Sequence, residues 1–424
     1  MTKKQSPDDF RRSVDSALAE MRELFPATPL QLNDHLSARF GARIWLKRED
    51  LSPVRSYKIR GAFNFIRKAL LENPQQNLFV CASAGNHAQG FAYVCRHFGR
   101  KGVVFMPVTT PQQKIDKTRI FGGEFIEIRL TGDFFDACYD AAREFALTEG
   151  ALMAPPFDHD DIIEGQASVG SEIAAQLPEG EVPDLVVLPV GGGGLSAGTA
   201  RYFEDRIDSD RFLLVEPAGA PSLKESLTEG HRVKLRKIDN FVDGAAVAEI
   251  GERNFEILSR FRPDQVMTVP ENAICLTMTR ILNTEGIVLE PAGALSISAL
   301  EALGPEQLAG KSVVAVVSGG NFDFERLPDV KERAMRYAGT KKYFILRLPQ
   351  RPGALKDLLN LLGPEDDIAR FEYLKKSARN FGSILIGIET GSPENFARLI
   401  EAFDQAGLSY QDITDNEIIS NLIV

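Results

Sequence analysis

Short apolar runs alternate with amphipathic stretches along the chain as far as about residue 320. The runs lie at residues 44–46, 78–82, 102–107, 124–129, 185–190, 212–216, 266–269 and 312–317. Runs without polar interruption are typical of strands that are buried on both faces, and the segments between them have apolar residues at helical spacing. The alternation therefore predicts an α/β fold in which helices flank parallel sheets.

The pattern changes after residue 325. Residues 326–340 are rich in charge and predict a linker helix. Beyond them we expect a strand at 343–348, a helix at 353–359, paired strands at 368–375 and 383–389, a helix at 394–406 and a strand at 409–413. This order is βαββαβ, the ferredoxin-like arrangement. We therefore expect three parts: a first domain at 1–325, a linker helix at 326–340 and an α+β domain at 341–424.

Composition narrows the class of protein. The chain has 424 residues, a net charge of −10 and 44% apolar residues, which is typical of an acidic soluble protein of two or three domains and disfavours nucleic acid as a partner. The N-terminus lacks an apolar signal region, and no run approaches membrane-spanning length, so we expect a cytoplasmic protein. The four cysteines and five histidines lack metal-ligand spacing, so we expect buried cysteines and no metal.

Lys58 is the first candidate for chemistry. It lies in Ser-Tyr-Lys-Ile-Arg-Gly-Ala at residues 56–62, near Lys47, Arg48, Arg55 and Arg60. A lysine that is desolvated or placed beside other cations has a lowered pKa and can form a Schiff base with a carbonyl. Taken alone, Lys58 is better explained as an ordinary solvated lysine. Three further segments change that interpretation.

The first segment is Ser-Ala-Gly-Asn-His-Ala-Gln-Gly at residues 83–90. It follows an apolar run and precedes a helical pattern, so the geometry is strand, tight loop and helix. Such a loop directs backbone N–H groups at an anion, and a substrate carboxylate suits it. Asn86 adds a side-chain amide at the loop tip, although asparagine is also common in plain turns.

The second segment contains four successive glycines after the run at 185–190. Each glycine loses much conformational entropy when the chain folds. Four in a row are therefore expected only where the backbone groups themselves are needed. Their bare N–H groups at the start of a helix predict a phosphate site, with a flexible turn as the alternative. The segment matches neither the P-loop lysine motif nor the dinucleotide fingerprint. It comprises Gly191, Gly192, Gly193, Gly194 and Leu195.

The third segment begins with Ser318, which follows the run at 312–317. Ligands of open α/β sheets lie outside the carboxyl ends of strands, so Ser318 is placed to meet a cofactor ring. A hydroxyl can donate to or accept from a pyridine nitrogen without forcing it to stay protonated, unlike an aspartate. As a lone residue it would be an ordinary serine at the end of a strand.

These segments, in this order, resemble the fold-type II pyridoxal-phosphate enzymes, and most closely the threonine dehydratases (threonine ammonia-lyases). The resemblance covers nearly the whole chain and includes Glu164-Gly165-Gln166, Glu285-Gly286, Glu290-Pro291-Ala292-Gly293 and Ser318-Gly319-Gly320-Asn321. It implies two parallel-sheet subdomains and pyridoxal 5′-phosphate as cofactor. Lys58 is then the Schiff-base lysine, and Asn86 meets the phenolic oxygen of the cofactor. Gly191 to Leu195 hold its phosphate and Ser318 faces its ring nitrogen, while the substrate carboxylate is bound by Ser83, Ala84, Gly85, Asn86 and His87.

The C-terminal segment, with Arg-Pro-Gly-Ala-Leu at residues 351–355, is similar to the ACT-like regulatory domain of biosynthetic threonine dehydratases. Only one ACT-like domain fits in the residues after the linker, which resembles the short form of the biosynthetic threonine dehydratases. The resemblance implies isoleucine as effector and a homo-oligomer, with a tetramer favoured. An assembly module without a ligand is the alternative.

The resemblance implies deamination of L-threonine to 2-oxobutanoate and ammonia, which is the first step of isoleucine biosynthesis. Lys58 would then be the base that removes the proton from the α-carbon. L-serine stays open as a second substrate. A catabolic serine/threonine dehydratase is one alternative, and an inactive amino-acid sensor is another. Relatives that racemise serine have a serine where this chain has Ala84, and they bind a cation through a Glu-Pro motif with an aspartate six residues after the glutamate. Alanine cannot transfer a proton, so Ala84 disfavours racemisation. Glu216-Pro217 is present here, but the residue six positions after Glu216 is Ser222, which disfavours that metal site.

Overall fold

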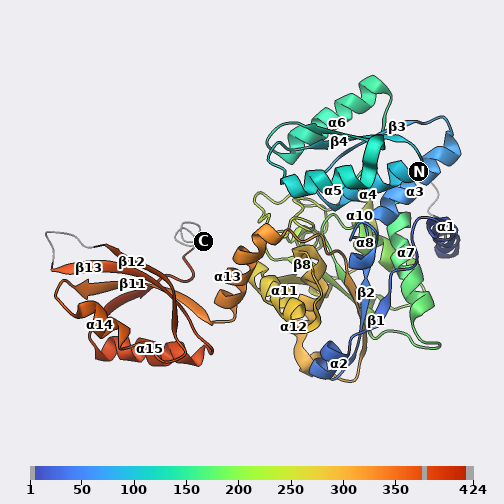
Figure 1. The fold of residues 1–424 in the computed structure, drawn as a ribbon. Coiled ribbons are helices and arrows are strands. Elements are labelled where there is room, and N and C mark those ends of the chain that lie inside the picture. The colour runs from blue at the N-terminus through green and yellow to red at the C-terminus, as the bar shows by residue number, and fades with distance from the viewer. Residues whose placement is uncertain (1–4, 375–379, 417–424) are drawn as a thin grey trace. The chain divides into compact units, whose positions relative to one another are not determined.

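The computed structural model describes residues 5–374 and 380–416. The chain divides into two compact units, Met1–Ile274 with Glu285–Asp323, and Cys275–Thr284 with Phe324–Val424. Each unit has its own sheet structure (Figure 1).

The larger sheet of the first unit has six strands in the order β1-β2-β10-β7-β8-β9. Only β1 is antiparallel to its neighbour. The strands are β1 (Leu30–Leu32), β2 (Arg43–Arg48), β7 (Leu185–Pro189), β8 (Phe212–Pro217), β9 (Val266–Val269) and β10 (Ser312–Val317). Their side chains form a core with apolar residues of α1 (Pro7–Met21), α7 (Asp160–Gln176) and α8 (Gly194–Tyr202).

The smaller sheet of the first unit is parallel throughout, in the order β5-β4-β3-β6. Its strands are β3 (Leu78–Ala82), β4 (Lys101–Met106), β5 (Ile126–Leu130) and β6 (Leu152–Met153). Phe79 and Cys81 pack with α3 (Lys58–Glu72) and α4 (Asn86–His97), whereas Val80 and Ala82 pack with α6 (Phe135–Glu149). Because both faces are covered, β3 must be a continuous apolar run.

The remaining helices of this part of the chain lie around the two sheets. They are α2 (Asp34–Phe40), α5 (Gln112–Gly122), α9 (Ser222–Glu229), α10 (Glu252–Leu258) and α12 (Pro291–Leu308). Most of helix α11 (Glu271–Glu285) belongs to the second unit. Within the described residues, none of the helices is both long and apolar enough to cross a membrane.

The second unit has an antiparallel sheet in the order β12-β13-β11-β14. Its elements are α13 (Leu327–Tyr337), β11 (Lys341–Pro349), α14 (Ala354–Leu359), β12 (Asp367–Leu374), β13 (Phe381–Glu389), α15 (Glu394–Gln405) and β14 (Ser409–Asp412). Alternate residues of β11 and β13, such as Phe344 and Ile386, form its core with Leu358, Leu399 and Phe403. The last residue expected in the first paired strand, Lys375, lies outside the described residues.

The predicted fold class is confirmed: two parallel sheets with flanking helices are followed by a ferredoxin-like domain. The expected buried cysteines are also confirmed, since Cys81, Cys95, Cys138 and Cys275 are all buried. The division at residues 325 and 340 stays our proposal. The sequence pattern missed β1 and β6, which are three and two residues long and too short to show periodicity.

Candidate active site

Lys58 is the first residue of α3, and the loop before it is joined to the end of β10. The Tyr57 N–H donates to the Ser318 carbonyl at 3.2 Å, and Ser56 forms an isolated β-bridge with Gly319. The Gly320 N–H donates to the carbonyl of Arg55 at 2.9 Å. These backbone contacts bring Lys58 and Ser318 to the same carboxyl edge of the sheet, where ligands of α/β folds bind.

The Lys58 amine lies in an aromatic and largely desolvated setting. Its Nζ donates to the Pro156 carbonyl at 2.8 Å and is 5.3 Å and 5.8 Å from the ring centroids of Tyr57 and Phe157. Burial lowers the pKa of Lys58 to about 8, although the Glu290 carboxylate acts in the opposite direction. A lysine with this pKa has a substantial neutral, nucleophilic fraction near neutral pH.

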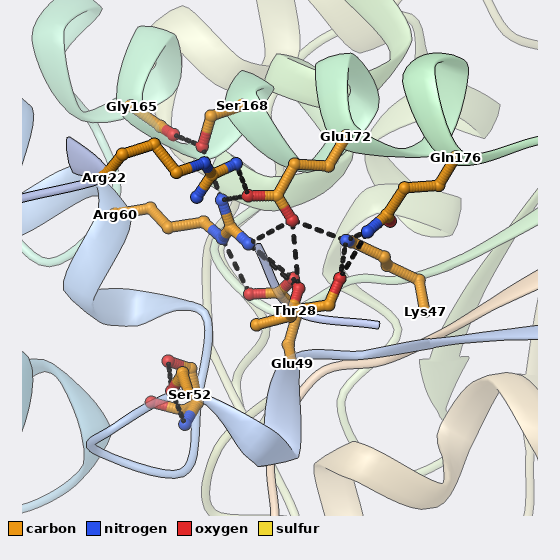
Figure 2. Close-up of polar contacts among 11 residues, drawn as sticks. Arg22, Thr28, Lys47, Glu49, Ser52, Arg60, Gly165, Ser168, Glu172 and Gln176 are labelled. Carbon is orange, nitrogen blue, oxygen red and sulfur yellow. Dashed lines mark hydrogen bonds and ion pairs between the residues drawn. The ribbon is translucent and has the colours of Figure 1, made fainter. Parts of the chain in front are cut away.

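The cations near Lys58 in sequence do not cause this lowering of its pKa. Arg60 donates to both oxygens of Glu49 and of Glu172, and Lys47 donates to Glu172 (Figure 2). Arg48 pairs with Asp50 at 2.7 Å. These charges are neutralised within their own contacts. The sequence allowed two causes for a lowered pKa of Lys58, namely burial and neighbouring cations. Burial is the one that acts.

The loop at residues 83–87 lies between β3 and α4. Helix α4 begins at Asn86 with Gly85 as its N-cap, and no side chain of the described residues caps it. Residues 83–86 are half-buried, and the Gly85 N–H donates to Ser83 Oγ at 3.2 Å. The N–H groups at the start of α4 can therefore bind an anion such as a carboxylate. Ala84, also in this loop, offers only its backbone.

His87 contributes no cationic side chain to this loop. Its Nε2 lies 3.0 Å from the Ala154 carbonyl, and the ring is 4% exposed. Burial, reinforced by the Lys58 charge, lowers the pKa of His87 to about 4. The imidazole is therefore neutral near pH 7, and because a carbonyl only accepts, Nε2 carries the proton. Only the backbone of His87 can serve a carboxylate.

The glycine loop, residues 191–194, leads from β7 into α8. Gly193 has a φ of +91° and caps the helix without any side-chain cap from the described residues. A Cβ at Gly192 would lie 2.3 Å from the Phe157 ring, and one at Gly191 would lie 2.8 Å from Ala245 Cα. The first N–H groups of α8 thus remain for an anion. The Leu195 side chain packs into the core, so only its N–H can face a ligand.

Asn254 orients the glycine loop, a role that no motif of the sequence indicates. Its Nδ2 donates to the Gly192 carbonyl at 2.6 Å, and the Gly251 N–H donates to the same oxygen at 3.2 Å. This carbonyl is therefore turned toward α10. The carbonyl and the N–H of one peptide unit point in opposite directions. The contacts of the Gly192 carbonyl therefore favour an N–H of the next residue, Gly193, that is directed into the loop.

Ser318 is 4% exposed, and its Oγ donates to the Ala292 carbonyl at 3.1 Å. A serine hydroxyl has one proton and two lone pairs. While that proton is given to Ala292, Ser318 can only accept a hydrogen bond from a ring nitrogen that carries a proton.

Glu290 and Asn321 are site residues to which the sequence analysis gave no role. Glu290 is 6% exposed and accepts a hydrogen bond from Asn86 Nδ2 at 2.7 Å. Burial, together with Asp243, raises the pKa of Glu290 to about 7. Asn321 Nδ2 donates to Asn86 Oδ1 at 2.8 Å. Both residues lie in motifs that carry the family resemblance. Their partners are far away in the sequence, so no pattern of neighbouring residues indicates these contacts.

Glu216 has a structural environment of its own. It is buried, which raises its pKa to about 7, and it accepts N–H groups of Leu223 at 2.7 Å and Lys224 at 2.9 Å. It thus caps the start of α9. Throughout the described residues, no group of three or more His, Cys, Asp or Glu side chains is arranged to hold a metal.

Gly192→Ala tests the close packing of the glycine loop. Its Cβ would overlap the Phe157 ring, so we expect a loss of about 1–3 kcal/mol in the free energy of unfolding and weaker phosphate binding. Urea denaturation and titration of the apoenzyme with cofactor measure the two effects. The control is Gly391→Ala, where the nearest atom would be 3.4 Å away. Equal behaviour of the two variants would contradict this account of the loop.

Comparison with known proteins agrees with this geometry. Residues 22–319 match the pyridoxal-phosphate dependent enzyme family, and residues 332–423 match the C-terminal regulatory domain of threonine dehydratase. A biosynthetic L-threonine dehydratase of Halalkalibacterium halodurans is 44% identical over 95% of this chain and 96% of its own length. That of Bacillus subtilis is 44% identical over 97% of each chain.

The fold also matches a solved structure. The processed form of threonine deaminase isoform 2 from Solanum lycopersicum has a TM-score of 0.70 and 36% identity, covering 78% of this chain and 94% of that one. The family match at residues 22–319 includes the lysine, the two loops and the serine described above. The chain therefore belongs to the pyridoxal-phosphate dependent enzymes and, within them, to the biosynthetic threonine dehydratase family.

Proposed function

We propose that this protein deaminates L-threonine to 2-oxobutanoate and ammonia with pyridoxal phosphate as cofactor, as the first step of isoleucine biosynthesis, under feedback control by isoleucine. The observation that carries this proposal is the convergence of Lys58, Ser318, the glycine loop and the loop at 83–87 at the carboxyl ends of the first unit's strands. It occurs in a chain 44% identical to biosynthetic threonine dehydratases over nearly its whole length.

The residues of the site fit the cofactor. The glycine loop has uncapped N–H groups and space that a Cβ would fill, which suits a phosphate dianion. Lys58 is a half-buried amine with a lowered pKa, which suits covalent attachment to an aldehyde. Ser318 and Asn86 offer hydrogen bonds for a ring nitrogen and a phenolic oxygen. When bound, the cofactor supplies an electron sink for the carbanion at the substrate α-carbon.

The chain's own residues supply binding and proton transfer. The N–H groups at the start of α4 hold the substrate carboxylate, which orients the α-carbon. The Lys58 amine would take the α-proton of the substrate on Nζ. The Tyr57 and Phe157 rings lie beside this amine, and its burial favours the neutral form. The β-hydroxyl of threonine would leave as water with the proton that Lys58 Nζ has taken, and addition of water to the dehydrated product would give 2-oxobutanoate and ammonia.

Elimination is favoured over racemisation by the residue at position 84. A racemase needs a second acid or base on the opposite face of the carbanion. Ala84 has a methyl group there and cannot transfer a proton. The C-terminal regulatory domain favours the biosynthetic enzyme over the catabolic one, and the intact Lys58, Asn86 and Ser318 disfavour an inactive sensor.

A steady-state assay of 2-oxobutanoate release from L-threonine, with L-serine in parallel, tests this proposal. We expect release from threonine, and a 5- to 150-fold rise in its apparent KM with isoleucine, which corresponds to a coupling of about 1–3 kcal/mol. Protein that binds the cofactor but releases no 2-oxo acid would support the sensor instead. Release that isoleucine does not change would support the catabolic alternative.

The effector site that we propose is a cavity of about 370 Å³ within the second unit. It lies at the end of β11, the start of α14 and the start of β14. Arg347, Arg351 and Asp357 contribute charge, and Arg351 pairs with Asp357 at 2.7 Å. The apolar lining is Leu348, Pro349, Ala354, Leu358, Leu361, Phe381, Ala406 and Leu408. A branched amino acid matches this lining, with its carboxylate on an arginine, its ammonium on Asp357 and its side chain among the leucines. A tetramer and a cytoplasmic location are further parts of the proposal.

Arg351→Gln is expected to weaken isoleucine binding by about tenfold, because it removes a charged donor from the rim of this cavity. Turnover of threonine without isoleucine should not change. Calorimetry on the full chain measures the first effect and the steady-state assay the second. The control is Arg370→Gln on β12, whose guanidinium pairs with Glu372 at 2.7 Å and does not line the cavity. Undiminished isoleucine affinity in Arg351→Gln would contradict this effector site.

A further inference from the structure

The side chain of Asn86 is oriented by hydrogen bonds that begin at a backbone carbonyl. The Val54 carbonyl can only accept, and Asn321 Nδ2 donates to it at 2.8 Å. The same Nδ2 donates its other proton to Asn86 Oδ1 at 2.8 Å. An amide nitrogen has two protons, so both are used. The oxygen of the Asn86 amide must therefore face Asn321.

The other end of the Asn86 amide is held by Glu290. Asn86 Nδ2 donates to Glu290 Oε1 at 2.7 Å, which uses one of its two protons. The second N–H remains, on a side chain that is half-buried at the start of α4. One donor of fixed direction is thus left for a ligand.

The two residues that hold Asn86 are themselves tightly placed. A Cβ at Gly319 would lie 2.0 Å from Glu290 Oε1, so the Glu290 carboxylate occupies the space that this glycine leaves. Asn321 Oδ1 accepts from Lys117 Nζ at 3.4 Å, in addition to the two bonds made by its nitrogen. Asn321 comes shortly after Ser318, and Glu290 directly precedes α12. The support for Asn86 therefore comes from the end of β10, through Asn321, and from the start of α12, through Glu290.

We propose that Asn321 and Glu290 are positioning residues, which fix the Asn86 amide so that its remaining N–H is directed to the phenolic oxygen of the cofactor. This inference rests on the proposed role of Asn86. Neither residue needs to touch the cofactor. If Asn321 is lost, the Asn86 amide can rotate and present its oxygen, which cannot donate to a phenolate.

A double-mutant cycle tests the part of Asn321. The dissociation constant of pyridoxal phosphate is measured by absorbance titration of the full-length apoenzyme for wild type, Asn86→Ala, Asn321→Ala and the double variant. We expect each single change to weaken cofactor binding about three- to tenfold, and the double variant to be no weaker than Asn86→Ala. The positioning role of Asn321 is overturned if Asn321→Ala leaves the cofactor affinity unchanged. It is also overturned if the loss of affinity in the double variant equals the sum of the losses in the two single variants.

Two further variants separate positioning from general damage to the fold. Asn321→Asp keeps the size of the side chain but cannot donate to Asn86, so it should weaken cofactor binding as Asn321→Ala does. Glu290→Gln keeps an acceptor oxygen for Asn86 and should bind cofactor within about twofold of wild type, whereas Glu290→Ala should lose three- to tenfold. Wild-type affinity in Asn321→Asp, or an equal loss in Glu290→Gln and Glu290→Ala, would overturn the corresponding assignment.

The proposed function can fail separately from this inference. If Asn86→Ala alone leaves cofactor affinity unchanged, the assumed role of Asn86 is wrong, and with it the positioning role. If Asn86→Ala weakens binding while Asn321→Ala and Glu290→Ala do not, only the positioning role is wrong.

Discussion

Replacing Lys58 with alanine is expected to abolish 2-oxobutanoate release and covalent retention of the cofactor. The amine is the attachment point and the base in our account, and loss of acid/base catalysis alone costs at least about 10²-fold. The fold should persist, because Lys58 Nζ makes one hydrogen bond, to the Pro156 carbonyl, and alanine favours the helix that begins there.

Lys58→Arg and Lys68→Gln serve as controls for this variant. Arginine keeps the positive charge but cannot form the covalent bond, so Lys58→Arg should be as inactive as Lys58→Ala. Lys68 lies on the same helix and pairs with Glu164 at 2.7 Å, so Lys68→Gln should retain activity. More than a few per cent of wild-type turnover in Lys58→Ala would refute the assignment.

The second large effect is expected from the buried ionic network next to α3. Arg60 and Lys47 are fully buried: Arg60 donates to the carboxylates of Glu49 and Glu172, and Lys47 donates to that of Glu172 (Figure 2). The Thr28 hydroxyl donates to both carboxylates. The network links β2, the segment after it, α3 and α7. Burial alone would raise the pKa of Glu172, but Arg60 and Lys47 hold it well below its ordinary value.

Glu172→Ala should reduce the free energy of unfolding by about 3–5 kcal/mol, since it leaves two buried cations with one carboxylate. Urea denaturation measures this loss. Glu127→Ala, which breaks the exposed pair with Arg129, should cost less than about 1 kcal/mol. Because Arg60 lies two residues after Lys58 on α3, turnover should also fall in Glu172→Ala. If Glu172→Ala lowered the free energy of unfolding as little as Glu127→Ala does, the network would not stabilise the fold as we propose.

The same network gives acid sensitivity with a definite sign. A carboxyl group whose pKa is lowered on folding contributes stability that is present above its unfolded pKa of about 4.3 and is lost as the pH falls toward the folded value. The unfolding free energy of the wild type should therefore fall on acidification below about pH 4.3. Glu172→Ala should lack that part of the fall.

The sequence predicted the central strands well and the edge strands poorly. Strands such as β3 and β10 are buried on both faces, so they had to be continuous apolar runs. The short edge strands β1 and β6 need little apolar surface and left no pattern. The ferredoxin-like part was visible because α15 and β13 each bury one face, which gives regular spacing.

The site was predictable as far as it consists of continuous segments. Lys58, the two loops and Ser318 each follow or precede an apolar run, so their place at a strand end could be inferred. The partners of Asn86 could not, because Asn321 and Glu290 reach it only through the folded structure. The cause of the lowered pKa of Lys58 could not be chosen either, since Glu172, which neutralises Arg60 and Lys47, is remote in sequence.

The most direct test of the account is to find which side chain carries the cofactor. Reduction of the cofactor-loaded enzyme with sodium borohydride makes the bond between the cofactor and its lysine permanent, and digestion followed by mass spectrometry then locates it. We predict the added mass on Lys58, in the segment that joins β2 to α3. The added mass on another lysine, or on none in protein that turns over threonine, would contradict the central claim.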